Sequence, residues 1–244
     1  MTSSLEVYCD FDGTITRGDT IDVLLEKLAD PEWHEIEDRW VKGEIGSREC
    51  MALQVPLIRG GWKAILEVLN EVKIDPSFPK FASWCKQNGI ALKVVSDGID
   101  RVIHHILKRE GIYVTNVWAN HLVEDEQENL SLTFPHAPVV LACGSGLCKC
   151  KILENGPKRT MKVVIGDGRS DFCWSNDADL VFAKDKLLAY CKQMGINSVA
   201  YEDFYLVRSV LEQKIADFGR SDVYQPAMPT VAQFAPPMHA AMVG

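Results

Sequence analysis

Short apolar runs alternate with longer segments of helical periodicity along most of the chain. Five runs are short and sharply bounded, which is typical of buried strands of a parallel sheet: residues 5–9, 90–95, 112–119, 161–165 and 180–183. The segments that follow them carry apolar residues at helical spacing, at 79–87, 99–108, 149–155, 185–194 and 203–218. This alternation predicts an α/β fold, a three-layer Rossmann-like core around a parallel sheet with right-handed crossovers.

The segment between the first and second predicted strands contains only helical periodicity. Four helices are expected there, over residues 19–28, 33–43, 49–58 and 62–72. We therefore predict an inserted helical cap at 17–76, and a catalytic core made of 1–16 and 77–219. Within the core, residues 121–124 and 129–134 are expected to pair as a hairpin across an acidic turn.

The composition changes near residue 219. Residues 220–244 contain four prolines and no apolar period, so we expect a flexible Pro-rich tail.

Composition and charge narrow the class of protein. The chain has 244 residues, 47% of them hydrophobic, and a net charge of −8. Nothing resembles a signal peptide or a membrane-spanning segment, so a cytoplasmic protein without a membrane partner is expected. The negative charge argues against nucleic acid as a partner. A small anionic substrate would have to be attracted by a local metal and a few basic side chains. A homodimer is left open.

The eight cysteines are interpreted first as reduced thiols. Cys143, Cys148 and Cys150, with His136 or His121, could instead form a zinc site. Their spacing is not that of the usual paired zinc ligands, so packed thiols are the favoured interpretation.

Candidate chemistry begins where the first strand ends, at Asp10 and Asp12, followed by Gly13. Ligands of open α/β sheets bind beyond the carboxyl ends of strands. Two carboxylates there suit phosphoryl transfer, because one can attack phosphorus and form an aspartyl-phosphate while the other exchanges a proton with the leaving oxygen. A solvated Asp-Gly turn is the structural alternative.

Other polar groups follow later strands. Ser96 and the Gly98 amide could bind phosphate, the latter as part of a helix N-terminus, and Lys149 could neutralise it. Asp10 and Asp167, completed by the Asp12 carbonyl, could hold Mg²⁺, with Asp171 binding the ion or orienting a water. Taken singly, each has a simpler role: Ser96 and Asp171 as helix caps, Lys149 as a solvated side chain. Their common position at strand ends makes coincidence improbable.

Four segments together resemble the motifs of the haloacid dehalogenase superfamily: residues 10–14, 96–98, Lys149 and 166–171. The resemblance covers residues 5–218. It implies that Asp10 is the nucleophile and Asp12 the general acid and base. It further implies that Ser96 and Lys149 bind phosphate, and that Asp10, Asp12 and Asp167 bind Mg²⁺ with support from Asp171.

Within this superfamily the chain resembles the phosphoserine-phosphatase-like branch. It looks most similar to the phosphatases of methionine salvage, on residues 9–16, 31–33, 201–205 and the cysteines near Lys149. Phosphoserine phosphatases hold the amino acid with a Glu and a cap Arg, where this chain has Asp19 and Gln54. The Arg that would grip a carboxylate is missing there, although Arg48 or Arg59 could substitute. Asp19, Arg48 and Gln54 are therefore the candidate leaving-group contacts.

The resulting prediction is an Mg²⁺-dependent phosphatase of a small phosphorylated metabolite. A phosphomonoesterase of the phosphoserine or phosphocholine type is an alternative, as is a phosphotransferase or mutase. A dehalogenase is disfavoured because that reaction would not use the carboxylates expected to bind Mg²⁺. A non-catalytic phospho-ligand binding protein is the alternative from a different class.

Overall fold

A computed structural model describes residues 4–138 and 144–218 of the chain. The predicted tail at 220–244 and Cys143 therefore lie outside the described residues. In chain order the elements are β1 Ser4–Cys9, α1 Thr20–Leu28, α2 Trp33–Val41, α3 Ser47–Gln54, a 3-10 turn Val55–Leu57, α4 Gly61–Leu69, α5 Phe78–Gln87, β2 Ala91–Ile99, α6 Asp100–Arg109, β3 Asn116–Glu124, β4 Leu130–Thr133, α7 Lys149–Glu154, β5 Thr160–Gly166, a 3-10 turn Arg169–Asp171, α8 Phe172–Ser175, β6 Leu180–Ala183, α9 Asp185–Met194, β7 Ser198–Ala200 and α10 Phe204–Phe218.

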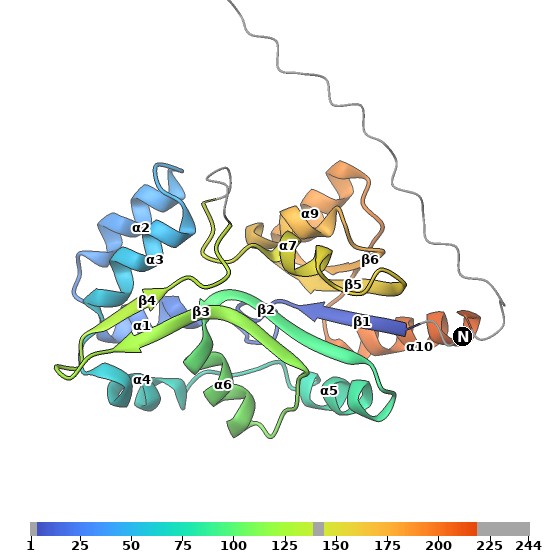
Figure 1. Ribbon diagram of the computed structural model, residues 1–244, viewed down its shortest axis with the longest axis horizontal. Coiled ribbons are helices and arrows are strands. Elements are labelled where there is room, and N and C mark those ends of the chain that lie inside the picture. Colours follow the sequence, from blue (N-terminus) through green and yellow to red (C-terminus); the bar gives the residue numbers. More distant parts are fainter. Residues whose placement is uncertain (1–3, 139–143, 219–244) are drawn as a thin grey trace, which may run out of the picture.

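One seven-stranded sheet forms the middle layer, in the order β4-β3-β2-β1-β5-β6-β7. All neighbouring strands are parallel except β3 and β4. Helices α5, α6 and α10 lie on one face and α7 and α9 on the other (Figure 1). The expected α/β fold, a three-layer Rossmann-like parallel sheet, is confirmed.

The alternation of side chains along each strand supplies both faces of the sheet. On β1, Val7 and Cys9 belong to a large apolar cluster, whereas Tyr8 belongs to a second one. On β5, Val163 and Val164 divide in the same way. Because helices bury both faces of the central strands, β5 and β6 are apolar over most of their length, and such apolar runs are the pattern that indicated strands in the sequence.

Several predicted boundaries were wrong. The third strand begins at Asn116 rather than at 112, and it continues without a break into the hairpin, where His121 pairs with Thr133. The predicted helix at 49–58 ends at Gln54, and a 3-10 turn follows because Pro56 has no N–H to donate. The short strand β7 and the single-turn helix α8 were not predicted, since neither is long enough to show a period.

The helices α1 to α4 leave and rejoin the sheet through two connections that lie side by side. Thr16 forms an antiparallel bridge with Ile74, and the Asp75 amide donates to the Ile15 carbonyl at 2.8 Å. The buried side chains of α1 and α4, such as Leu24 and Ile65, belong to the same apolar cluster as the sheet. In α2, Trp33 is the one buried residue.

The β3–β4 hairpin packs against this helical segment. Glu124 accepts a hydrogen bond from the Trp62 amide at 2.7 Å and forms an ion pair with Arg101 at 3.3 Å. The Arg101 guanidinium in turn lies 4.3 Å from the centre of the Trp62 ring. The hairpin therefore joins the edge of the sheet to the start of α4.

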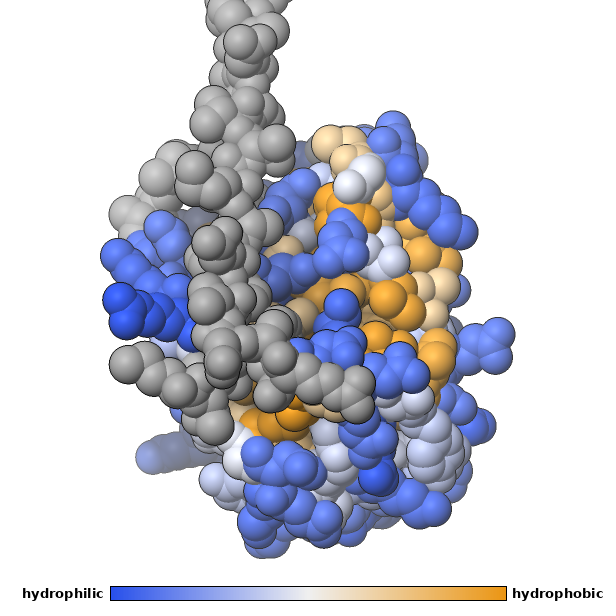
Figure 2. Space-filling view, turned by 90° about the vertical axis from the view of Figure 1, so that its right-hand side faces the viewer, coloured by the Kyte–Doolittle hydropathy of each residue, from blue (hydrophilic) through white to orange (hydrophobic). Residues whose placement is uncertain are grey.

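At the end of the molecule where α10 lies, hydrophobic residues are interspersed with hydrophilic ones (Figure 2). Helix α10 itself exposes Tyr205, Leu206 and Ile215. No helix among the described residues has the length and apolarity needed to cross a membrane.

Candidate active site

Three adjacent strands, β2, β1 and β5, end at the same edge of the sheet and bring the predicted motifs together. Asp10 follows β1, Ser96 lies near the end of β2, and Asp167 follows β5. The Asp10 amide still donates to Ile165 of β5 at 2.9 Å, so this residue is held by the sheet itself. The common edge is a consequence of parallel strands, whose carboxyl ends all lie on one side.

Lys149 is buried at the centre of this edge, with a side chain that is 1% exposed. Its Nζ lies 2.9 Å from Asp10 Oδ1 and 2.8 Å from Asp171 Oδ1, and it donates to Ser170 Oγ at 3.1 Å. Burial alone would lower the pKa of Lys149, but the two carboxylates outweigh it and raise the pKa. The alternative of a solvated lysine is therefore wrong.

Asp10, Asp167 and Asp171 form a carboxylate cluster, with one oxygen of each within 4.8 Å of the others. Burial first, and then the charge of Asp171, raises the pKa of Asp10, while Lys149 opposes the shift. One ammonium compensates one of three carboxylates, which leaves two negative charges in a buried site. A divalent, oxygen-binding cation fits this donor set, and it would favour the ionised carboxylates.

Asp171 also caps the turn that carries it. Its Oδ2 accepts hydrogen bonds from the amides of Asp167 and Gly168, both at 3.1 Å, while its Oδ1 faces Lys149. The capping role and the site role that the sequence offered as alternatives are thus both present. Each oxygen of this fully buried carboxylate performs one of them.

Asp12 is held by a residue that the sequence did not single out. Its Oδ1 accepts from the Thr20 amide at 2.9 Å and from the Thr20 hydroxyl at 2.7 Å, and its Oδ2 lies 3.3 Å from Ser96 Oγ. Burial raises the pKa of Asp12, and the hydrogen bonds from Thr20 and Ser96 moderate the rise. The Thr20 contact links α1 directly to the site.

Two glycines let the carboxylates approach. Gly13 has a φ of +70°, and a Cβ on it would lie 2.5 Å from Asp167 Oδ2. A Cβ on Gly98 would lie 2.5 Å from Asp12 Oδ2. A larger residue at either position would displace a site carboxylate.

Ser96 and Gly98 lie at the predicted strand end, but their local roles differ from expectation. Helix α6 begins at Asp100 with Ile99 as its cap, so Ser96 is not the helix cap. The Gly98 amide donates to Ser96 Oγ at 2.9 Å. Gly98 therefore belongs to a strand end rather than to a helix N-terminus, and its amide orients the serine hydroxyl.

The three predicted leaving-group contacts differ in burial and in their local partners. Asp19 is exposed and caps α1, accepting from the amides of Ile21 and Asp22. Gln54 is buried, and its Nε2 donates to Glu37 Oε2 at 2.9 Å. The Arg48 side chain is half-buried, and the described residues offer it no ion-pair or hydrogen-bond partner.

Besides Thr20, three residues of the site escaped the sequence reasoning. Thr14 donates to Asp167 Oδ1 at 2.9 Å, Ser170 contacts Lys149, and the Trp174 ring lies 5.0 Å from Lys149 Nζ. Thr14 and Ser170 lie inside the motifs that were recognised, so their sequence positions close to Asp12 and Asp171 could have identified them. No sequence signal pointed to Trp174, because its contact with Lys149 depends on the packing of α8.

The zinc hypothesis for the cysteines is only partly covered by the described residues. Cys148 and Cys150 have their Sγ atoms 3.4 Å apart, but Cys143 lies outside the described part. His121 is engaged with Asp100 Oδ2 at 2.7 Å. Within the described part, the group that could hold a metal is the carboxylate cluster.

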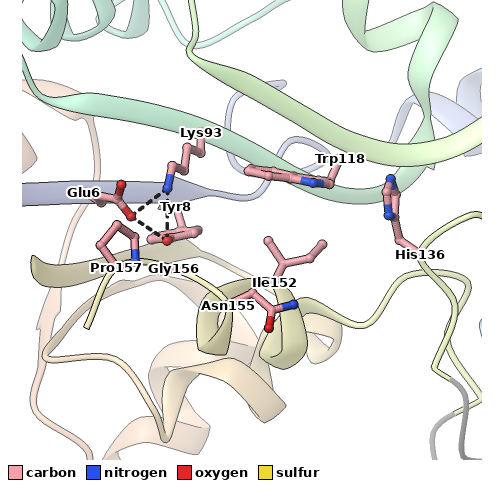
Figure 3. A pocket seen from close by; sticks show the side chains of 9 residues that line it. All are labelled: Glu6, Tyr8, Lys93, Trp118, His136, Ile152, Asn155, Gly156 and Pro157. Carbon is pink, nitrogen blue, oxygen red and sulfur yellow. Dashed lines mark hydrogen bonds and ion pairs between the residues drawn. The ribbon is translucent and has the colours of Figure 1, made fainter. Parts of the chain in front are cut away.

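A pocket of about 280 Å³ lies between the sheet and α7, and its lining includes Lys93 of β2 and Ile152 of α7 (Figure 3). Its charged groups are buried and satisfy one another: Lys93 Nζ lies 2.6 Å from Glu6 and 3.2 Å from the Tyr8 hydroxyl. None of the residues predicted for phosphate or Mg²⁺ binding lines it, although the candidate zinc ligand His136 does. The pocket and the candidate active site are therefore separate features.

Comparisons with known proteins identify the family of the chain. Residues 7–175 match the family model of haloacid dehalogenase-like hydrolases. A 2-hydroxy-3-keto-5-methylthiopentenyl-1-phosphate phosphatase from Bacillus velezensis is 31% identical, covering 87% of this chain and 92% of that protein. A protein of the same name from Geobacillus kaustophilus is 30% identical, covering 87% and 98%.

Solved structures give the same fold. A phospho-aspartyl intermediate analogue of phosphoserine phosphatase superposes with a TM-score of 0.63 at 18% identity, covering 86% of this chain and 99% of that one. A probable phosphoserine phosphatase from Vibrio cholerae gives 0.69 at 18%, covering 90% and 68%. The expected superfamily, branch and phosphatase class are confirmed, and the chain belongs to the haloacid dehalogenase-like hydrolases.

Proposed function

We propose that the protein hydrolyses 2-hydroxy-3-keto-5-methylthiopentenyl-1-phosphate, or a closely similar phosphate monoester with an uncharged leaving group, through an aspartyl-phosphate on Asp10. The observation that carries the catalytic part is the buried Lys149 between Asp10 and Asp171, beside Asp167. Attraction of a phosphate group to a site rich in carboxylates requires such a fixed ammonium and a cation.

Asp10 is the proposed nucleophile because of how its oxygens are used. Lys149 and the Phe11 amide both contact Oδ1, at 2.9 and 2.8 Å. The other oxygen, Oδ2, is left to attack phosphorus, and the Oδ1 contacts fix the orientation of the carboxylate. The new P–O bond replaces the bond to the leaving oxygen, and water later cleaves the acyl-phosphate.

Asp12 is the proposed acid and base. Thr20 holds its Oδ1 through two hydrogen bonds, so Oδ2 is the oxygen that can carry the proton. Its raised pKa favours a protonated carboxyl that can donate to the leaving oxygen. After departure of the alcohol, the same carboxylate accepts a proton from the attacking water.

Ser96 and Lys149 would bind the phosphoryl oxygens. Asp10, Asp167, Asp171 and the Asp12 carbonyl are the groups that would hold Mg²⁺, as in the family in general. When bound, the ion neutralises phosphoryl charge as a Lewis acid.

The helical segment favours a leaving group without a carboxylate. Gln54, at the place of the expected Arg, is buried and bonded to Glu37. Partial desolvation raises the pKa of Asp22, and the charges of Glu37 and Asp12 add to the shift, so carboxylates gather on this side of α1. They would repel the carboxylate of phosphoserine. The ester named for the relatives contains hydroxyl, ketone and thioether groups, none of them anionic.

The test is a comparison of purified protein on four substrates with and without Mg²⁺: the methylthiopentenyl phosphate, phosphoserine, phosphocholine and an aryl phosphate. We expect the highest kcat/KM for the first and Mg²⁺-dependent turnover of the aryl ester. An Arg48→Ala variant is the matched control, because Arg48 is the cap cation that could serve a carboxylate.

A preference for phosphoserine that disappears in Arg48→Ala would overturn the substrate while leaving the catalytic proposal intact. A preference for phosphocholine would instead assign the acidic side of α1 to a cationic leaving group. Binding of all four esters with no turnover would show a phospho-ligand binding protein.

A further inference from the structure

Two thiols flank the central lysine of the site. Cys148 directly precedes Lys149 and Cys150 directly follows it, at the first turn of α7. Their Sγ atoms lie 3.4 Å apart, and neither residue is part of a disulfide. A change in this pair acts on the backbone on both sides of Lys149.

We propose that Cys148 and Cys150 are an oxidative modification site, at which a hydroperoxide converts the thiol pair to a disulfide and so moves Lys149 away from Asp10. The inference relies on the place of Lys149 in the proposed site.

The geometry permits the bond. Residues two positions apart have Cα atoms at most about 7 Å from each other, and disulfides form at Cα separations of about 4.4–6.8 Å. Closing the gap between the two Sγ atoms to the covalent length requires a shift of about 1.3 Å. Rotation of the two side chains can supply part of this shift, but the ring that closes contains only Lys149 between the two cysteines, so the disulfide also constrains the backbone on both sides of Lys149.

The pair is also accessible. Both side chains are half-buried, whereas Cys9, Cys50, Cys85 and Cys191 are buried. A groove of about 570 Å³ opens beside them, lined by Cys148, Cys150, Lys151, Glu154, Lys162 and Asp177. A small peroxide can therefore reach these sulfurs. Among the described residues, Cys173 on α8 is exposed and close to Cys150, so it is the competing partner there.

The chemistry balances in two steps. One cysteine, as thiolate, attacks an oxygen of the peroxide ROOH, forms a sulfenic acid and releases ROH. The second thiol attacks the sulfenic sulfur, forms the S–S bond and releases water. Both sulfurs are oxidised by one electron each, and the two peroxide oxygens are reduced. A dithiol reductant reverses the reaction.

The consequence falls on Lys149, whose Nζ contacts Asp10 and Asp171 at 2.9 and 2.8 Å. Displacement of an active-site group by about 1 Å can cost on the order of a hundredfold in rate. The movement would also leave two buried carboxylates without their ammonium.

The experiment treats the Mg²⁺-loaded protein with hydrogen peroxide, removes the excess with catalase, and measures aryl phosphate hydrolysis before and after dithiothreitol. Peptide mass spectrometry identifies the disulfide. We expect a loss on the order of a hundredfold that the reductant reverses, whereas Cys148→Ser and Cys150→Ser stay within about twofold of their untreated rates. Cys173→Ser is the control and should respond like the wild type.

A Cys150–Cys173 disulfide, or protection by Cys173→Ser, would overturn the assignment of the pair. Formation of the Cys148–Cys150 disulfide without loss of rate would refute the displacement of Lys149. A loss that dithiothreitol does not reverse would indicate overoxidation instead. If the untreated protein has no phosphatase activity, the proposed function fails, while the peptide masses still decide whether the pair oxidises.

Discussion

Asp10 is held through one carboxylate oxygen, Oδ1, by Lys149 and the Phe11 amide. An Asp10→Asn variant keeps the shape but cannot form an acyl-phosphate, so we expect kcat on an aryl phosphate to fall by several powers of ten. A thermal melt of the same variant checks that the fold is retained. Turnover near the wild-type rate with Mg²⁺ present would show that another group attacks.

Thr20 offers a finer test, because it acts through Asp12. Thr20→Val removes the hydroxyl that donates to Asp12 Oδ1 at 2.7 Å, while the amide contact remains. A hydrogen bond to a charged group contributes about 1.5–3 kcal/mol, equivalent to roughly ten- to hundredfold in rate. The loss should be larger for alkyl esters than for aryl esters, which need little protonation. Thr20→Ser should restore most of the rate; equal losses on both esters would count against this role.

Among the elements, α3 makes the contact that could close the helical segment over the site. The Ser47 hydroxyl donates to Asp97 Oδ2 at 2.6 Å, and the Arg48 amide donates to the Gly144 carbonyl at 3.0 Å. Gly46 approaches Gly144 so closely that an added Cβ would overlap its backbone. The loop it touches leads directly into Lys149.

We therefore predict that Gly46→Ala hinders this approach. KM for the preferred ester should rise about tenfold, the effect of losing roughly 1.4 kcal/mol of binding, while kcat on a small aryl phosphate changes little. Ala52→Gly, at an exposed position of the same helix, is the control for helix stability. An equal loss on both substrates would show that the contact supports the fold and not closure.

The division into a core and a cap at 17–76 stays a prediction. The packing of the four cap helices indicates which of them could move relative to the sheet. Helices α1 and α4 each place several buried side chains in the apolar cluster of the sheet, α3 contributes Met51, and α2 contributes only Trp33. If the segment moves as a lid, α2 is the part that can move at the lowest cost, because it exposes the least apolar surface on opening.

At the scale of the whole molecule, we predict that the thermal stability depends on a divalent cation, because Lys149 compensates only one of the three carboxylates of Asp10, Asp167 and Asp171. Mg²⁺ binding to the folded state raises stability by RT ln(1 + [L]/Kd), about 2.7 kcal/mol at a hundred times Kd. EDTA should lower Tm and stop turnover, and Mg²⁺ should restore both. Ca²⁺ should restore Tm but not activity, because it takes more ligands at longer distances.

The site of this effect can be checked with one pair of variants. Asp167→Asn should abolish the Mg²⁺-dependent rise in Tm, since it removes one carboxylate of the cluster. Glu126→Gln, in the exposed hairpin turn, changes the charge equally and should leave the rise intact. A rise in Tm that survives Asp167→Asn would place the ion elsewhere.

The sequence by itself determined the periods and the ends of the strands. Apolar runs such as 161–165 predicted strands because both sheet faces are buried, and Asp10, Ser96 and Asp167 were predicted together because parallel strands end at one edge. Helices α1 and α9 were likewise predicted to within a residue, since each buries one face and exposes the other.

Only the tertiary structure decided which side chains meet. Several contacts leave no periodic pattern in the sequence. They are the Thr20–Asp12, Thr14–Asp167 and Gln54–Glu37 hydrogen bonds and the contact between the thiols of Cys148 and Cys150. β7 depends on the strand beside it, and the continuity of β3 depends on its partners β2 and β4. The physical reason is that periodicity records which face of an element is buried, whereas contact geometry depends on how separate elements pack in space.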